Sequence, residues 1–150
     1  MPAVLDASVT LPWFLHDERT AFTDSVFAAL GKDEFWVPAV WRLEFPNALL
    51  VAERKRRIDR QTRLEALEFA SGLALRVDAA PIDMRSISAI AERHGLSTYD
   101  ASYLELAARQ RFGLVTLDRA LADAAGAAGI AVQSPGRASA AQTRKRYAAA

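Results

Sequence analysis

The sequence of 150 residues has the length of one domain, and its 51% hydrophobic and 25% charged residues are typical of a folded protein rather than a disordered one. It contains no cysteine, which excludes disulfides and thiolate zinc sites and favours a reducing compartment. No basic stretch followed by an apolar run opens the chain, and no window approaches the roughly 18 apolar residues of a membrane span. We therefore expect a cytoplasmic protein with no membrane segment.

The formal net charge of +1 is unevenly distributed along the chain. Residues 134–150 hold four basic residues and no acid, so residues 1–133 carry 15 basic and 18 acidic residues, a formal charge of −3. Basic clusters can bind phosphates, but on charge alone a solvated helix face and a soluble tail are the better explanation. The second basic cluster consists of Arg54, Lys55, Arg56, Arg57, Arg60 and Arg63.

Short apolar runs alternate with longer helical patterns, which predicts an α/β fold with a parallel sheet. Pro12 suits the first turn of a helix, and Pro46 is compatible only with the beginning of one. Helices are expected over residues 21–30, from 40 toward the second basic cluster, and over 61–73, 84–93, 98–111 and 121–128. Short strands are expected at residues 3–5, 35–37, 75–77, 114–116 and 130–132.

No internal repeat and no linker divides the chain. We expect one domain over residues 1–133, followed by a basic, flexible tail over 134–150. This tail is rich in alanine, serine, arginine and glutamine after Pro135 and Gly136. Such a segment is expected to be partly disordered, or helical only when bound.

Four acids that lie far apart in the sequence are predicted to share one edge of the sheet. Asp6 follows the first expected strand directly, and Asp118 lies just beyond the fourth. Ligand sites of open parallel sheets lie at the carboxyl ends of their strands. Glu44 and Asp100 lie near the beginnings of two helices that would start from the same edge. The four carboxylates are therefore expected to surround one crevice.

Clustered carboxylates repel one another, and they cannot all ionise in a crevice of low dielectric constant without a cation. Oxygen ligands alone suit Mg²⁺ or Mn²⁺ rather than zinc or copper. A hard divalent ion can polarise a phosphodiester, lower the pKa of a bound water and neutralise the leaving oxygen. The pattern thus indicates a metal-dependent hydrolase whose ligands are Asp6, Glu44, Asp100 and Asp118.

Each acid also has a simpler interpretation when it is taken alone. Asp6 and Asp100 could be helix N-terminal acids, which the helix dipole favours. Asp118 could start a turn, and Glu44 could be a surface residue. Only their common expected location favours a site.

Three smaller polar residues are candidates for supporting these acids. Ser8 lies two residues after Asp6 and could donate its hydroxyl to a carboxylate or a metal-bound water. Asn47 shares a helix face with Glu44, and Thr116 points to the same side of a strand end as Asp118. Capping or turn formation is the more frequent explanation for residues of these types.

Histidines and tryptophans contribute less to the interpretation. His16 and His94 are far apart and have no nucleophile near them in sequence, and His94 before Gly95 is typical of a helix C-terminus. The three tryptophans could stack on bases, but we expect Trp36 in the core and Trp13 at an interface.

The stretches around these acids resemble the PIN-domain ribonucleases, in particular the VapC toxins of bacterial toxin–antitoxin pairs. The order and separation of the stretches match that family over about residues 3–133. Any one of them is a weak signal, but the four together are specific. They are Val4-Leu5-Asp6-Ala7-Ser8 with Trp13-Phe14-Leu15 after it, Pro38 through Leu49, Thr98 through Ala107, and Leu114 through Leu121.

This resemblance implies a three-layer α/β/α PIN-like fold with a central, mainly parallel sheet of four to five short strands. It also implies dependence on Mg²⁺, with Mn²⁺ as a substitute, and endonucleolytic cleavage of RNA as the toxin of a toxin–antitoxin pair. Homodimers and a VapB-like antitoxin that covers the site, often with an arginine among the acids, are implied as well. Some members carry another acid or asparagine after the last aspartate. Here Arg119 occupies that position, so we expect four ligands and one firmly held metal.

Other functions remain open at the level of sequence. A non-catalytic PIN-like module that binds RNA or protein would keep the fold and the basic clusters but lose metal affinity. A haloacid-dehalogenase-like phosphatase would require an aspartate where Ser8 stands, and a phosphorylation receiver would require a lysine near the last strand end. The sequence does not identify the RNA, and it does not decide whether the second basic cluster follows RNA or binds a partner.

Overall fold

The computed structural model describes residues 1–136, and these residues build one central sheet. All strand pairs are parallel, and the strand order is β3-β2-β1-β4-β5. The five expected strands are confirmed, with the last two displaced by one or two residues. They are β1 (Ala3–Leu5), β2 (Phe35–Val37), β3 (Leu75–Val77), β4 (Gly113–Val115) and β5 (Val132–Gln133).

The centre of the sheet is also its most apolar part. Val4 and Leu5 of β1 and Leu114 and Val115 of β4 are fully buried, and Val4 pairs with Leu114. Strands covered on both faces require continuous apolar runs rather than alternation, which is why these short stretches could be recognised.

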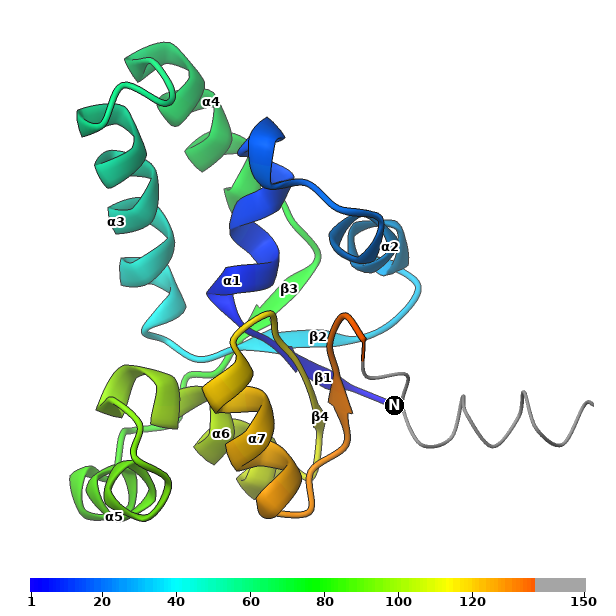
Figure 1. Ribbon diagram of the computed structural model, residues 1–150, viewed down its shortest axis with the longest axis vertical. Helices are drawn as coiled ribbons and strands as arrows, with labels where there is room; N and C mark the ends of the chain where they lie inside the picture. The colour runs from blue at the N-terminus through cyan, green and yellow to red at the C-terminus, as the bar shows by residue number, and fades with distance from the viewer. Residues whose placement is uncertain (137–150) are drawn as a thin grey trace, which may run out of the picture.

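Helices occupy both faces of the sheet (Figure 1). Two 3-10 helices, Leu11–Trp13 and His16–Glu18, follow the short first helix. The α-helices of the described part are α1 (Ala7–Thr10), α2 (Ala21–Ala29), α3 (Trp41–Arg54), α4 (Arg60–Ser71), α5 (Met84–His94), α6 (Thr98–Gln110) and α7 (Arg119–Ala127).

The strand order explains how the layers form. From β1 to β3 each connection moves in one direction along the sheet, and from β3 through β4 to β5 the chain moves in the other. Right-handed crossovers then place α1–α4 on one face and α5–α7 on the opposite face, as Figure 1 shows. The expected three-layer α/β/α arrangement with a parallel sheet is confirmed.

Local sequence signals account for most helix boundaries. Asp83 caps α5 through the backbone N–H groups of Arg85 and Ser86, and Gly95 ends the helix with a φ of +64°. Pro12 lies in the first 3-10 helix, where a proline is tolerated early. Pro46 is the sixth residue of α3, so it removes one hydrogen bond from within the helix.

The second basic cluster begins where α3 ends. The helix expected from residue 40 toward this cluster ends at Arg54, its first residue, and Arg56 adopts a φ of +59° in the turn before α4. The side chain of Arg57 forms ion pairs with Asp17 and Glu18, at N–O distances of 2.9 and 3.1 Å. The cluster therefore spans two helices and a turn, and part of its charge is neutralised within the protein.

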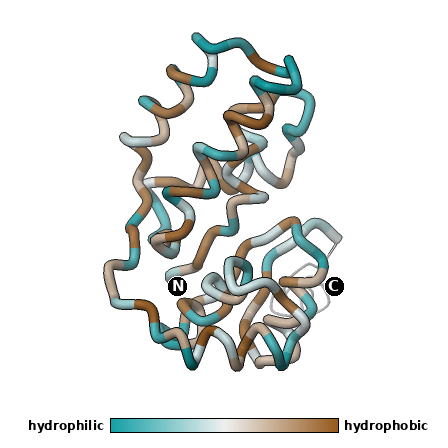
Figure 2. Tube along the Cα trace, turned by 90° about the vertical axis from the view of Figure 1, so that its left-hand side faces the viewer, coloured by the Kyte–Doolittle hydropathy of each residue, from teal (hydrophilic) through white to brown (hydrophobic). Residues whose placement is uncertain are grey.

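Hydrophilic and hydrophobic residues alternate along the helices (Figure 2), which is the pattern of helices packed on one side. Within residues 1–136 no helix is both long and apolar enough to cross a membrane. Most of the basic tail, residues 137–150, lies outside the described residues, so the expectation for it stays a prediction.

The central strands should dominate stability. Leu114 is fully buried in β4, so Leu114→Ala is expected to lower the free energy of unfolding by roughly 2–5 kcal/mol in urea denaturation. Leu43→Ala is the matched control because its side chain is 73% exposed, and it should change stability by less than about 0.5 kcal/mol. Equal losses in the two variants would contradict this view of the core.

Candidate active site

The site lies where the sheet reverses its direction of winding. β1 and β4 are neighbours, but the helices that follow them leave toward opposite faces of the sheet. Such a switch point opens a crevice at the carboxyl ends of the two strands. Asp6 follows β1 directly, and Thr116 and Asp118 follow β4. The topology therefore brings together two stretches that are 110 residues apart in the sequence.

Asp6 is the most deeply placed of the four acids. Its side chain is 5% exposed, and it stands at the N-cap position of α1 without capping that helix. Its Oδ2 instead accepts hydrogen bonds from the Ser8 hydroxyl at 2.6 Å and from the Thr116 hydroxyl at 2.8 Å. Asp6 therefore lies at a helix N-terminus, as its simpler interpretation states, but its side chain binds two hydroxyls and not the N–H groups of the helix.

The two hydroxyls are themselves oriented by backbone groups. Ser8 Oγ accepts the N–H of Leu117 at 3.0 Å, and Thr116 Oγ1 accepts the N–H of Asp118 at 2.9 Å. Because each oxygen accepts from the β4–α7 loop, its own proton is directed to Asp6 Oδ2. Asp6 Oδ1 receives no hydrogen bond from a described residue. Among the described residues, every side-chain oxygen that is fully buried has a hydrogen-bond partner, so Oδ1 must be in contact with solvent. Oδ1 is thus the oxygen available to a ligand.

Asp118 and Asp100 lie at the first turns of α7 and α6. Asp118 Oδ1 accepts a hydrogen bond of 2.8 Å from the N–H of Leu121, so Asp118 caps α7. One oxygen of Asp118 therefore has the local role that its simpler interpretation suggested. The Asp100 N–H donates to the hydroxyl of the cap residue Ser97 at 3.1 Å, and a hydrogen bond with Ser97 also works against the rise in the pKa of the Asp100 carboxyl. Both acids are half-buried.

Glu44 has a partner that sequence reasoning did not select. Its Oε1 accepts a hydrogen bond of 2.9 Å from the hydroxyl of Tyr103, which is fully buried in α6. Tyr103 lies three residues after Asp100, and this spacing on one helix face was the signal that could have found it. Asn47 is exposed on α3, and its role beside Glu44 stays a prediction.

The environment of Asp6 raises its pKa. Burial is the largest cause, and the charges of Asp100 and Asp118 add to it, while the hydrogen bonds from Ser8 and Thr116 oppose the rise. The hydroxyls therefore stabilise a carboxylate that burial and its neighbours destabilise. Asp6, Asp100 and Asp118 therefore share one electrostatic environment.

The same coupling extends to the remaining acids. Burial raises the pKa of Glu44, the Tyr103 hydrogen bond opposes this, and the charges of Asp6 and Asp100 reinforce it. Burial and then the charge of Asp118 raise the pKa of Asp100. Burial, followed by the charges of Glu44 and Asp6, raises the pKa of Tyr103, so its phenol stays a proton donor. Each of the four acids therefore acts on the pKa of at least one other, and their joint role as a site stays a prediction.

The donor chemistry of the crevice suits a hard divalent cation, because it offers carboxylate and hydroxyl oxygens only. Within residues 1–136, however, no three acidic or histidine side chains are placed to hold one ion directly. Mg²⁺ usually keeps several water ligands and is held by one or two carboxylates, so a direct three-acid cage is not required. The residues present fit such an ion, and their role as its ligands remains a prediction.

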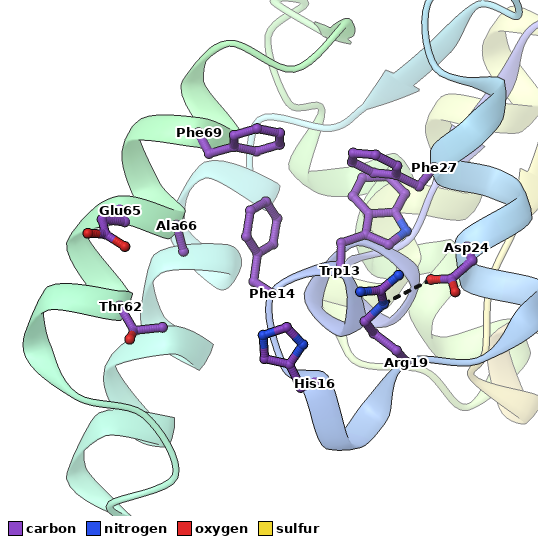
Figure 3. A pocket seen from close by; sticks show the side chains of 10 residues that line it. All are labelled: Trp13, Phe14, His16, Arg19, Asp24, Phe27, Thr62, Glu65, Ala66 and Phe69. Carbon is purple, nitrogen blue, oxygen red and sulfur yellow. Dashed lines mark hydrogen bonds and ion pairs between the residues drawn. The ribbon is translucent and has the colours of Figure 1, made fainter.

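A separate pocket of about 490 Å³ lies between α2, α4 and the 3-10 helices (Figure 3). Aromatic rings form its inner wall, and none of the four acids lines it. Phe69 is 56% exposed and Phe27 39%, and the charged side chains of Arg19, Asp24 and Glu65 complete the lining. The aromatic residues are Trp13, Phe14, Phe27 and Phe69.

The tryptophans are engaged in packing. Trp41 is buried and donates its indole N–H to Thr10 at 3.0 Å. Trp36 is half-buried against Phe112, with ring centroids 5.8 Å apart, so its expected core position is only partly reached. Trp13 is half-buried in the wall of the aromatic pocket, and its interface role stays a prediction.

The model of the PIN domain matches residues 3–127 of the sequence. The chain belongs to the PIN-domain family. PIN domains are generally nucleases and generally use divalent metal ions. No curated protein matches the sequence at a significant level.

Three solved structures share the fold at low sequence identity. A protein of Pyrobaculum aerophilum, PAE2754, is 23% identical with a TM-score of 0.66, over 100% of this chain and 97% of that one. VapBC2 from Rickettsia felis, bound to a DNA fragment from its promoter, is 12% identical with a TM-score of 0.61, over 89% of this chain and 98% of that one. A toxin–antitoxin complex from Klebsiella pneumoniae is 15% identical with a TM-score of 0.52, over 77% of this chain and 86% of that one.

The hydroxyl of Thr116 should set the ionisation of Asp6. Thr116→Val keeps the shape of the side chain but removes a donor to Oδ2, so the pKa of Asp6 is expected to rise further. Carboxyl titration by NMR measures this pKa. Thr62→Val, on the exposed surface of α4, is the control and should leave it unchanged. A fall in the pKa of Asp6 in Thr116→Val would refute the described orientation.

The raised pKa values predict an unusual dependence of stability on pH. A carboxyl whose pKa is higher in the folded than in the unfolded state costs stability at neutral pH. Without metal, the contribution of Asp6, Glu44 and Asp100 to the free energy of unfolding should therefore grow as the pH falls from 7 toward their ordinary values of 3.8 and 4.5. Thermal unfolding in EDTA should show a higher midpoint for Asp6→Asn than for the wild type at pH 7.5, and a smaller difference at pH 5.

The control for this measurement is an acid with the opposite shift. Hydrogen bonding to Arg57 lowers the pKa of the exposed Asp17, so Asp17→Asn should not raise the midpoint at pH 7.5. An Asp6→Asn midpoint below that of the wild type at both pH values would show that the charge of Asp6 does not destabilise the metal-free fold.

Proposed function

We propose that the protein is an Mg²⁺-dependent endoribonuclease that acts as the toxin of a toxin–antitoxin pair and inhibits translation or growth by cleaving RNA. The observation that carries the proposal is the buried carboxylate of Asp6, whose pKa is raised by burial and by the charges of Asp100 and Asp118. Destabilised, mutually repelling carboxylates at a sheet switch point are typical of functional sites. Membership of a family of nucleases gives this site its reaction class.

Each residue of the site has a definite task in this proposal. Asp6, Glu44, Asp100 and Asp118 would hold the ion, directly or through its water ligands. Ser8 and Thr116 keep Oδ2 of Asp6 occupied, which leaves Oδ1 for the ion. When bound, Mg²⁺ or Mn²⁺ would polarise the phosphodiester and activate water for its hydrolysis.

We expect one firmly held ion rather than two. Arg119 is exposed and directly follows Asp118, so a cation stands where a fifth carboxylate would strengthen a second site. The exposed residues Arg54, Lys55, Arg56 and Arg60 provide positive charge that can contact RNA phosphates at a distance from the acids.

The partner in this proposal is a VapB-like antitoxin. Two structures of the same fold are themselves described as a VapBC complex and a toxin–antitoxin complex, which supports a partner of this kind. The aromatic pocket of Figure 3 suits the apolar face of a peptide helix, and it is a surface distinct from the acids. A homodimer and a cytoplasmic location remain predictions from the resemblance and the composition.

One observation favours a second candidate, a non-catalytic PIN-like module that binds RNA or protein. In the described residues no three acidic side chains are poised around one ion position. Calorimetric titration with Mg²⁺ and Mn²⁺ separates the two functions, because the absence of binding in the millimolar range would favour the binding module.

The nuclease should be metal-dependent and should require its central acids. The purified protein is expected to cut structured RNA only with Mg²⁺ or Mn²⁺, and the cleavage rate should fall roughly a hundredfold or more in Asp6→Asn and Asp100→Asn. Gel analysis of end-labelled RNA measures both effects. Asp24→Asn is the matched control, since Asp24 lies in the wall of the aromatic pocket and should leave the rate unchanged. Equal cleavage by the wild type in excess EDTA would rule out the metal mechanism.

A further inference from the structure

Glu44 and Asp100 approach the crevice from opposite layers of the protein. α3, which carries Glu44, packs mainly on α4, α1 and the first 3-10 helix, whereas α6 packs on α5, α7, β1 and β4. The hydrogen bond between Tyr103 and Glu44 joins these two layers past the carboxyl end of β1. It spans 59 residues of sequence, and its donor is fully buried.

The position of Tyr103 on α6 couples two acids. Tyr103 follows Asp100 by three residues, so both side chains leave the same face of the helix. One rigid helix thereby supplies an acid itself and the donor that holds another acid, while Asp6 is held by Ser8 and Thr116. Asp6 thus has two hydroxyl donors, and Glu44 has one.

A core tyrosine only needs some acceptor for its hydroxyl, and a neutral backbone carbonyl is the ordinary choice. Tyr103 instead donates to a half-buried carboxylate that faces two other acids. Repulsion from Asp6 and Asp100 would turn an untethered Glu44 side chain toward solvent. The hydrogen bond holds Glu44 against that repulsion.

We propose that Tyr103 is a positioning residue, whose hydroxyl keeps the carboxylate of Glu44 on the metal side of the crevice. This inference rests on the proposed metal-dependent function and extends it to a residue outside the acid set. In this proposal Tyr103 acts through Glu44, to which it donates its hydroxyl proton. Its contribution is expected in metal affinity, because partners that orient metal ligands contribute roughly 10- to 100-fold to binding.

The test measures the dissociation constant of Mn²⁺ by calorimetry in the purified full chain. Tyr103→Phe keeps the ring and removes only the hydroxyl, and it is expected to weaken Mn²⁺ binding by roughly tenfold. Tyr99→Phe is the matched control, since it makes the same change four residues earlier on α6 at a side chain that is 61% exposed. This control should bind Mn²⁺ as the wild type does.

A double-mutant cycle separates positioning from a general structural effect. In a Glu44→Gln background, Tyr103→Phe should cause no further weakening, because the residue it positions no longer contributes its charge. Equal weakening in both backgrounds, or unchanged affinity in Tyr103→Phe, would overturn the inference while leaving the nuclease intact. If the wild type itself binds no Mn²⁺, the proposed function fails first, and this inference falls with it.

A second measurement uses the wild type and does not depend on a variant that folds. With ¹³C-labelled tyrosine, the ring resonances of Tyr103 are expected to shift in step with saturation by Mg²⁺. The reason is that an ion bound to Glu44 would withdraw electron density from the carboxylate to which the Tyr103 hydroxyl donates. Resonances of Tyr103 that stay fixed up to saturation would overturn the proposed coupling.

Discussion

A carboxylate buried at the end of the central strand is the constraint around which the rest of the site is arranged. Burying a charge is costly unless hydrogen bonds or an opposite charge compensate it. At Asp6 two hydroxyls provide part of the compensation, and each is aligned by a backbone N–H of the β4–α7 loop. The charges of Asp100 and Asp118 work in the opposite direction. The charge of the Asp6 carboxylate is therefore only partly compensated by the groups around it.

The order of the strands lets short loops bring the residues of this site together. Because β1 and β4 are neighbours whose helices leave toward opposite faces, the loop after β4 can reach the residue after β1 directly. The same reversal separates α3 from α6, so Glu44 and Asp100 approach from two layers. The hydrogen bond from Tyr103 to Glu44 is a direct interaction between these two layers at the site.

The four acids and the aromatic pocket lie in different parts of the protein. The acids lie at the ends of the central strands, whereas the aromatic pocket lies between α2, α4 and the 3-10 helices. The ion pairs of Arg57 with Asp17 and Glu18 hold the α3–α4 turn against the second 3-10 helix, near that pocket. The acids and the aromatic pocket can therefore be altered by separate substitutions.

The choice of the four acids as site residues stays a prediction, whereas the five strands and most helices that the sequence indicated are confirmed. These depend on apolar runs, caps and spacings that act over a few residues, as at Asp83 and Gly95. The tertiary structure decided what depends on distant groups: the strand order, the hydroxyl partners of Asp6, and the selection of Tyr103 as the donor to Glu44. It also directed the side chain of Asp6, at the start of α1, to two hydroxyls instead of to the helix N–H groups. Local periodicity reports which face of an element is buried, but only packing decides which residue lies opposite it.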